Sequence, residues 1–357
     1  MAKRLLILSA GSGPSNNLIR SLRAGIRSLV VVGCHADEFV LKKSLADRNY
    51  LTPATSRSDF PRALRQIIKA ESIDLIVPNS EADVSTVSDL SAALPCRTFL
   101  PGSKTIRLCQ DKYALTRFLG SRGLPVPRTY PVSAVKDVER VLRRLSRHSL
   151  LWCRIRRGSG SVGAIPVKSA AQARAWIRYW EEMRDVPKGS FTLSEYLSGR
   201  DFCVQSLWKE GRLVLTKMHE RLSYYAAGAS PSGVSSTAAV AKMVFIPRIA
   251  RMCATAVRAI DPRASGVFFV DLKENDGGKP CITEINAGRF ANVSTIHDAT
   301  GKYNTTAIYV RLALGDPVNL REAREPAGNC YVVRDIDALP VTFFADDLRA
   351  GVKDVRR

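Results

Sequence analysis

The chain has 357 residues, of which 45% are hydrophobic and 24% charged, an ordinary globular composition for a protein long enough to form two or three domains. No apolar run reaches the roughly 18 residues that a membrane span requires, and Leu5–Leu8 is too short for the core of a signal peptide. We therefore expect a cytoplasmic protein without a membrane partner. The 8 cysteines form no CxxC pair and no Cys/His cluster, which disfavours structural zinc and a disulfide framework.

The net charge of +21 favours acidic ligands and would permit non-specific binding to nucleic acid. The arginines, however, are spread over many predicted helix faces. No RRM-like signature, helix-turn-helix signature or basic tract with interleaved aromatic residues accompanies them. We expect a solvated basic surface, and a nucleic-acid partner is the less favoured alternative.

Residues 1 to about 100 alternate between strand and helix, which predicts a doubly wound α/β domain with a parallel sheet. The expected strands are Arg4–Ser9, Leu29–Val32 and Ile73–Pro78. A helix is expected at Asn16–Ala24, and another is expected to be capped by the stretch Ser58–Pro61, with the proline near its first turn. The Gly11/Gly13 turn lacks the third glycine of a dinucleotide fingerprint, so we favour a packing role for it.

The middle of the chain contains a glycine-rich loop between two strands. One helix is predicted from Ser103 to Leu119, and the prolines in Gly123–Pro127 predict an extended linker. After the strand Leu150–Ile155, the loop Arg156–Ala164 carries three glycines and two serines. Such a loop lets backbone N–H groups approach phosphate oxygens. A strand follows it and GK[ST] is absent, so a P-loop fold is excluded. A flexible hairpin tip is the alternative.

The second half of the chain is predicted to contain more strands than helices. Strands are expected at Phe191–Leu197, Phe202–Trp208 and Arg212–Met218, and Leu222–Ser236 is predicted to be an active-site loop. Helices are expected at Ala170–Asp185, at Phe245–Ile260 and within Asp298–Ala313. Two short strands, Cys330–Val333 and Val341–Phe344, follow without an assigned place.

The stretch Ser265–Phe290 predicts a β-hairpin with an acidic cluster. The apolar run Val267–Val270 leads into Asp271, an Asn-Asp-Gly-Gly turn reverses the chain, and the returning strand carries Glu284 and Asn286. On antiparallel strands this turn can bring Asp271 close to the other two residues. Two carboxylates and an amide oxygen suit a Mg²⁺ ion that keeps its waters and grips a polyphosphate. An amphipathic hairpin with ordinary turn acids is the alternative.

In this order, the motifs resemble the ATP-grasp superfamily, and most closely the carboxylate–amine ligases similar to the large subunit of carbamoyl phosphate synthetase. The resemblance covers the chain to about Gly315. It implies an α/β protein in which a doubly wound pre-ATP-grasp domain precedes a two-lobed ATP-grasp fold. The implied domains are the N-terminal domain 1–102, the small lobe with a linking helix 103–195, the large lobe 196–315 and a C-terminal extension 316–357.

The resemblance also implies residue roles. Lys112 and Arg154 would bind the phosphates of ATP, with the loop residues Gly158, Gly160, Ser161 and Gly163. Arg154 and Ile155 stand where the family pattern usually has Lys and Pro. Three further positions would contact adenosine. Glu195 would bind the adenine amino group, and the backbone of Leu197 would contact the ring. Asp201, which is shorter than the usual Glu, would bind the ribose. Asp271, Glu284 and Asn286 match the family's ligands for Mg²⁺ or Mn²⁺.

The implied activity is ATP-dependent ligation of a small-molecule carboxylate to an amine, of the amino-acid or peptide type, through an acyl phosphate with release of ADP and phosphate. Arg289, Lys217, His219 and Arg221 are the candidates for holding the carboxylate and its acyl phosphate. His219 is a candidate base, with a packing role as the alternative. An ATP-grasp kinase and a non-catalytic nucleotide-binding protein also stay open, as does a homodimer. The basic charge suggests an acidic substrate such as a dicarboxylate or a phosphorylated acid.

Overall fold

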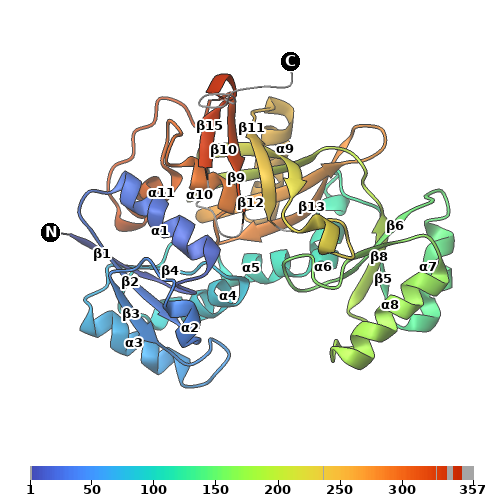
Figure 1. Ribbon diagram of the computed structural model, residues 1–357, viewed down its shortest axis with the longest axis horizontal. Coiled ribbons are helices and arrows are strands. Elements are labelled where there is room, and N and C mark those ends of the chain that lie inside the picture. The colour runs from blue at the N-terminus through green and yellow to red at the C-terminus, as the bar shows by residue number, and fades with distance from the viewer. Residues whose placement is uncertain (1, 236, 327, 336–340, 348–357) are drawn as a thin grey trace, which may run out of the picture.

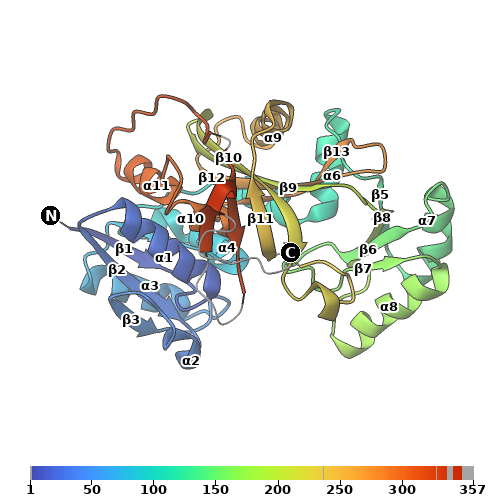
Figure 2. The same ribbon diagram turned by 45° about the horizontal axis from the view of Figure 1, so that its top comes forward.

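The computed structural model describes residues 2–235, 237–326, 328–335 and 341–347, so Ser236 of the predicted active-site loop and part of the predicted C-terminal extension lie outside the described residues. The N-terminal domain and the small lobe lie at opposite ends of the molecule, and the largest sheet lies between them (Figures 1 and 2). Within the described ranges, no helix is both long enough and apolar enough to cross a membrane.

The N-terminal domain is the doubly wound α/β domain that the sequence predicts. Its sheet is parallel, in the order β3 (Arg48–Leu51), β2 (Leu29–His35), β1 (Lys3–Ile7), β4 (Leu75–Val77). Successive residues of β1 are buried in two different cores, one on each face of the sheet. The helices that cover the sheet are α1 (Gly13–Gly25), α2 (Glu38–Leu41), α3 (Phe60–Ala70) and α4 (Glu81–Leu90). Asp59 stands at the start of α3 but makes no side-chain cap, and its carboxylate pairs with Arg57 instead.

The single helix predicted from Ser103 to Leu119 is two helices, α5 (Ser103–Gln110) and α6 (Lys112–Ser121). The chain breaks because Asp111 is extended and caps α6, its carboxylate accepting the backbone N–H groups of Tyr113 at 3.1 Å and Ala114 at 3.0 Å. The sequence grouped this region with the small lobe. In the structure, the buried hydrophobic residues of both helices join the core of the large lobe.

The small lobe is an antiparallel sheet in the order β5 (Thr129–Val132), β8 (Phe191–Glu195), β6 (Leu151–Ile155), β7 (Ile165–Val167). Two helices, α7 (Val138–Arg144) and α8 (Ala170–Met183), share its core. The glycine-rich loop joins β6 to β7, so the predicted strand–loop–strand arrangement is confirmed.

The large lobe contains a seven-stranded sheet that includes the predicted hairpin. The order is β13 (Pro280–Ala287), β12 (Gly266–Glu274), β9 (Asp201–Lys209), β10 (Arg212–Tyr224), β11 (Ala238–Met243), β14 (Cys330–Val333), β15 (Val341–Phe344). The two tail strands therefore extend this sheet at one edge. Because β10 continues to Tyr224, the first three residues of the predicted active-site loop are strand.

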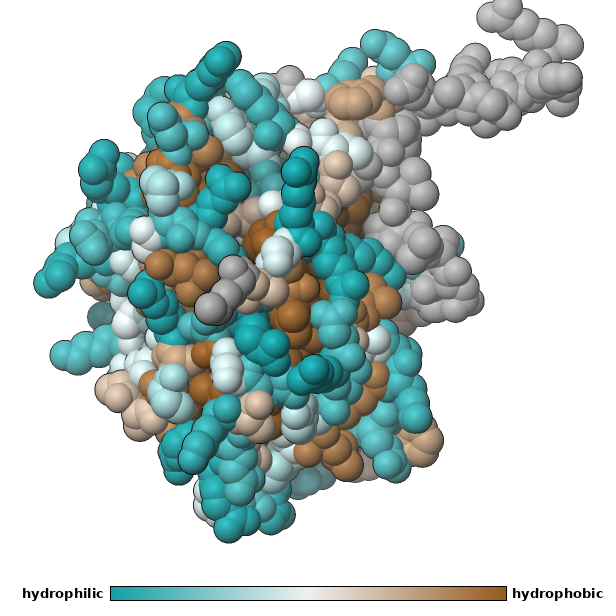
Figure 3. Space-filling view, turned by 90° about the vertical axis from the view of Figure 1, so that its left-hand side faces the viewer, coloured by the Kyte–Doolittle hydropathy of each residue, from teal (hydrophilic) through white to brown (hydrophobic). Residues whose placement is uncertain are grey.

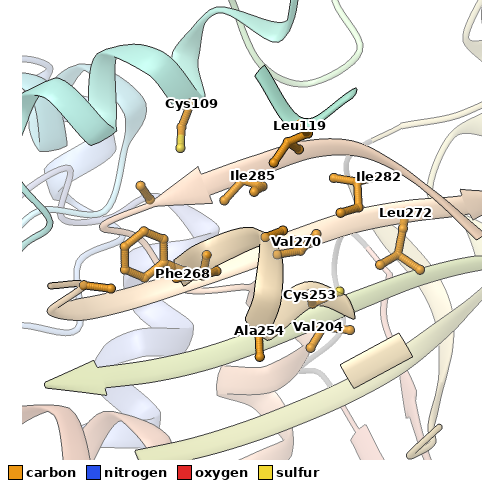
Figure 4. Close-up of a cluster of buried hydrophobic side chains, with 14 of the residues drawn as sticks. Cys109, Leu119, Val204, Cys253, Ala254, Phe268, Val270, Leu272, Ile282 and Ile285 are labelled. Atoms are coloured by element: carbon orange, nitrogen blue, oxygen red, sulfur yellow. The ribbon is translucent and has the colours of Figure 1, made fainter. Parts of the chain in front are cut away.

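One face of this sheet is apolar and carries the core of the large lobe. Figure 4 shows Phe268, Val270 and Leu272 of β12 with Ile282 and Ile285 of β13, close to residues from the α5–α6 region. Helix α9 (Pro247–Ile260) packs on this core through Cys253 and Ala254. On the opposite face, one end (Leu207, Leu215 and Val267) packs into the core shared with the N-terminal domain, and the rest of the face carries polar side chains.

Two helices connect the large lobe to the N-terminal domain. The predicted helix within 298–313 is α11 (Thr305–Leu314), and the sequence did not predict the short α10 (Asn292–His297) before it. Both contact α1, and Tyr309 of α11 shares a core with β1. Hydrophilic and hydrophobic residues are interspersed over the face of the molecule that Figure 3 shows. This face does not test the predicted homodimer, which stays a prediction.

Candidate active site

The polar face of the large sheet brings the predicted site residues together. Residues two apart on a strand share a face, and residues paired across strands share it too. In the observed register Asp271 pairs with Cys203 and Glu284, and Cys203 pairs with His219. The side chains that share this face are those of Asp201, Cys203, Gln205, Lys217, His219, Arg221, Phe269, Asp271 and Lys273.

A cavity of about 340 Å³ lies over this face and is lined by residues of all three parts of the molecule. The predicted site residues that line it are Lys112, Arg154, Gly158, Gly160, Ser161, Glu195, Leu197, Asp201, His219, Arg221, Asp271, Glu284 and Arg289. Asn286 borders a smaller pocket beside it, which Lys112, Glu284 and Arg289 also line. Gly163 and Lys217 line neither pocket.

The predicted metal ligands form one hydrogen-bonded cluster. The amide nitrogen of Asn286 donates to Asp271 Oδ2 at 3.3 Å and to Glu284 Oε1 at 3.2 Å, while its Oδ1 accepts from Arg289 Nε at 3.1 Å. The two carboxylates fit a hard cation such as Mg²⁺. Asn286 would fit it only after its amide turned to present oxygen. The described residues contain no group of three or more His, Cys, Asp or Glu side chains placed to hold a metal.

An arginine stands between Asp271 of this cluster and a further acid, Asp201. The guanidinium of Arg221 lies 2.7 Å from Asp201 Oδ1 and also pairs with Asp271 Oδ1. Burial raises the pKa of Asp271 to about 6 even though the charge of Arg221 opposes the shift. Asp201, the predicted ribose ligand, also accepts a hydrogen bond from the hydroxyl of Tyr224. Arg221 is thus the counter-ion of two acids with which the sequence did not pair it.

Glu284 has a different environment, with three cations around it. Burial alone would raise its pKa, but Lys112, Arg154 and Arg289 outweigh burial and lower the pKa to about 2. The Nζ of Lys112 lies 3.6 Å from Glu284 Oε2. Arg154 comes from the small lobe and donates to the backbone oxygen of Thr283 at 3.1 Å. Burial lowers the pKa of Arg154, and the charge of Glu284 opposes part of that shift. The cations predicted to bind phosphate therefore converge on this predicted metal ligand.

The glycine-rich loop is held in place at both ends. Asp111 accepts from Arg156 at 2.7 Å and from Arg157 at 3.3 Å, and Lys112 donates through its side chain to the backbone oxygen of Gly158. At the other end, Trp176 Nε1 donates to the backbone oxygen of Gly163 at 3.0 Å. Gly163 has φ +70°, and a Cβ there would lie 2.3 Å from Ile155, so this glycine shapes the loop rather than lining the cavity.

The predicted adenine end lies beside the small lobe. Glu195 Oε1 accepts from the backbone N–H of Arg128 at 2.7 Å, and Oε2 lies 3.7 Å from His148 Nε2. Leu197 follows two residues later and is buried in the cavity wall. Glu195 Oε2 therefore makes no close hydrogen bond to the backbone, and this oxygen is available to a ligand.

Two of the predicted catalytic residues have other surroundings than expected. Lys217 is buried, with its Nζ 2.7 Å from Asp298 Oδ1 and 3.6 Å from Glu325 Oε2, in an ion-pair network away from the cavity lining. His219 lines the cavity, and burial followed by the charge of Arg221 brings its pKa well below the usual value. Its imidazole is therefore neutral at physiological pH.

Comparison with solved structures identifies the architecture. A biotin carboxylase from Campylobacter jejuni is similar with a TM-score of 0.72 at 15% identity, over 94% of this chain and 76% of that one. An L-amino acid ligase from Bacillus licheniformis is similar with a TM-score of 0.68 at 15% identity, over 92% of this chain and 78% of that one. An N5-carboxyaminoimidazole synthetase from Staphylococcus aureus is similar with a TM-score of 0.66 at 14% identity, over 93% of this chain and 83% of that one. The chain has the ATP-grasp fold. No protein-family model and no curated protein matches the sequence.

Several residues of the ATP-grasp cavity carry no signal in the sequence. Asn79 from the N-terminal domain, Asn292 at the start of α10 and Arg334 just after β14 line it together with Tyr224 and Lys273. Period-2 alternation would place Tyr224 on the face opposite Arg221, and the register shifts of β10 after Arg221 are what bring its hydroxyl to Asp201. Arg334 could not have been found from alternation either, because its strand joins the sheet only through tertiary pairing with β11.

Proposed function

We propose that the protein is an ATP-dependent carboxylate–amine ligase that works through an acyl phosphate and releases ADP and phosphate. The observation that carries the proposal is the convergence, in one ATP-grasp cavity, of the Asp271/Glu284 pair, the glycine-rich loop and the cations Lys112 and Arg154. Two of the similar structures are named as a ligase or a synthetase, and another holds MgADP and bicarbonate. A scaffold that only bound a nucleotide would not need two acids beside the phosphate cations.

In this proposal the residues of the chain bind and orient the reactants. Lys112, Arg154 and the loop N–H groups would hold the phosphates of ATP, and Glu195 would receive the adenine amino group. Mg²⁺, when bound by Asp271 and Glu284, supplies positive charge to the phosphates. Most of the rate would then come from alignment and from fixed positive charge rather than from acid–base groups.

Arg289 is the residue that we assign to the reacting carboxylate. Its guanidinium is fixed from two sides, since it donates to Asn286 and lies 5.4 Å from the ring centroid of Phe269. It lines the cavity beside the acid pair, where an acyl phosphate would form. A planar guanidinium suits both a carboxylate and the acyl phosphate that forms when one carboxylate oxygen takes the γ-phosphoryl group of ATP and ADP leaves.

The surroundings of His219 suit a structural role in the cavity wall better than a role as a proton acceptor. A pKa well below the usual value makes its imidazole a weak base, because burial and the nearby Arg221 both disfavour the protonated form. Its Nδ1 is buried without a hydrogen-bond partner among the described residues. We therefore assign it a role in shaping the pocket, and the incoming amine would lose its proton to water or phosphate.

The test is ADP release with MgATP over a panel of carboxylic acids, each alone, with amino acids, and with hydroxylamine to trap an acyl phosphate as a hydroxamate. We expect ADP formation that requires an acid, together with a coupled product whose mass equals acid plus amine minus water. Glu284→Gln should abolish it, and the exposed Glu322→Gln is the matched control. Stable accumulation of a phosphorylated product that ignores both amines and hydroxylamine would instead establish a kinase.

A further inference from the structure

The cavity contains a cation that the proposed chemistry does not use. Arg334 follows β14, and its backbone N–H donates to the oxygen of Ala239 at 2.8 Å. Two residues earlier, Val332 pairs with Ala241, which in turn pairs with Arg221 on β10. Arg334 therefore projects from the same polar face of the sheet as Arg221, two strands further from the hairpin than β10.

The surroundings of Arg334 place it at the side of the cavity nearest the N-terminal domain. Its neighbour Asn292 begins α10, the helix that packs on α1, and the amide group of Asn292 lies 2.8 Å from Asn17 Nδ2 of α1. Pro14 and Asn79 of the N-terminal domain line the same cavity. The glycine-rich loop and Glu195 line it from the small lobe. Arg334 and the expected nucleotide thus occupy different regions of one cavity.

No acid balances the charge of Arg334 among the residues that the structure describes. With its amide oxygen turned toward the guanidinium, Asn292 accepts from the two terminal nitrogens at 3.0 and 3.1 Å, and Nε is buried without a partner. Burial lowers the pKa of Arg334, and no carboxylate of the described residues opposes that shift. By contrast, Lys112 pairs with Glu284, and Arg221 pairs with two acids.

A half-buried guanidinium that has only a neutral partner loses hydration without a compensating charge. Retaining such a group beside a cavity is reasonable where a ligand supplies the missing anion. Arginine is also the residue best matched to a planar anion, since its N–H groups can donate in parallel to both oxygens of a carboxylate. The ligand chemistry that fits this position is therefore a carboxylate.

We propose that Arg334, with Asn292, binds a substrate carboxylate other than the one that ATP activates. This inference rests on the proposed ligase function and narrows its substrate class. The second carboxylate has two sources, because it can belong to a dicarboxylic acyl donor or to an amino-acid nucleophile that keeps its carboxylate free. Arg334 would then be a specificity-determining residue, with Arg289 serving the reacting carboxylate.

The test measures binding, so that it does not depend on turnover. Calorimetric titrations of the full-length protein with MgADP present would compare each carboxylate with its amide: succinate and glutarate against their monoamides, and L-alanine and L-glutamate against their α-amides. We expect one of the two groups to bind about 10- to 100-fold tighter than its amides, the range for a charge-assisted hydrogen-bonded pair. A preference among the dicarboxylates identifies the acyl donor, and a preference among the amino acids identifies the nucleophile.

Arg334→Met should remove that preference while leaving the affinity for the amides and for MgADP unchanged. Arg334→Lys should restore part of it, and Arg251→Met, an exposed position on α9, should keep it in full. Wild-type protein that binds no carboxylate of the panel more tightly than its amide would overturn the inference, as would a preference that survives in Arg334→Met. An Arg334-dependent preference without any coupled product would support this site and count against the ligase function.

Discussion

The two acids of the candidate metal site should affect the stability of the metal-free protein in opposite directions. The perturbations are Asp271→Asn and Glu284→Gln, each of which removes one negative charge and keeps the shape. Asp271 is disfavoured in its charged form, with a pKa raised from 3.8 to about 6 by burial. Glu284 is favoured in its charged form, with a pKa lowered from 4.5 to about 2, because its three neighbouring cations outweigh burial. Two residues that share one proposed role thus have opposite energetic effects.

The magnitude follows from linkage. Each shift is a little over two pKa units, and a unit corresponds to about 1.4 kcal/mol, so each effect is about 3 kcal/mol at most. Ionisation of Asp271 destabilises the protein. This destabilisation grows as the pH rises from about 4 to about 6, and it has its full size above pH 6. Glu284 contributes stability that is complete above about pH 4.5 and is lost as pH falls toward 2. At pH 7.5, Asp271→Asn should therefore stabilise the protein and Glu284→Gln should destabilise it.

The assay is urea or thermal unfolding of both variants in EDTA at pH 7.5 and pH 4.5, with Glu322→Gln as the exposed control. For a chain of this size, each kcal/mol should move the melting temperature by about 2 °C. The advantage of Asp271→Asn over wild type should shrink at the lower pH. Both variants should lose Mg²⁺-dependent ATP turnover. Shifts in melting temperature of the same sign for the two variants would refute the charge assignment, whatever the turnover result.

Three further changes test separate parts of the site. Arg154→Met should raise the KM for ATP by about 10-fold or more through the loss of a charge-assisted phosphate contact, and unchanged nucleotide kinetics would move the phosphate site elsewhere. Lys217→Met should leave Asp298 as an unpaired buried charge and cost about 3–5 kcal/mol in urea unfolding, and a variant as stable as wild type would contradict the buried ion pair. Gly163→Ala should weaken MgADP binding in calorimetry, because residue 163 has φ +70° and an added Cβ would also press on the Ile155 side chain, and an unchanged Kd would contradict the assignment of the loop to the phosphates.

The acid cluster was predictable because it depends on local structure. Asp271 and Glu284 lie on two strands joined by a short turn, so alternation and turn chemistry alone set their distance. The doubly wound N-terminal domain was predictable for the same reason, since each strand–helix unit carries its own hydrophobic pattern. The break at Asp111 was not predicted, although an aspartate followed by helix formers is also a cap signal. There the continuous apolar pattern favoured a single helix.

Alternation also explains the prediction of Lys217 as a catalytic residue. Lys217, His219 and Arg221 are two apart on β10 and share one face, so the alternation pattern does not separate them. What separates them is the acidic pair Asp298 and Glu325, which come from outside the sheet and neutralise Lys217 where it is buried. A strand pattern predicts which face a side chain occupies. It does not predict which partners cover that face at each position.

The same limit explains why Arg334 was missed. Along the chain it follows the acid hairpin by more than forty residues, in a tail that contains no motif. It reaches the cavity only because β14 pairs with β11, which pairs with β10, and because α10 brings Asn292 to its guanidinium. Residues that bind the phosphates of ATP lie near glycines and turns that the sequence displays, since a phosphate is held largely by backbone geometry. A residue that selects the substrate needs only the right charge at the right point in space. Only the folded structure shows that Arg334 is a cation in the cavity for which the described residues supply no acid.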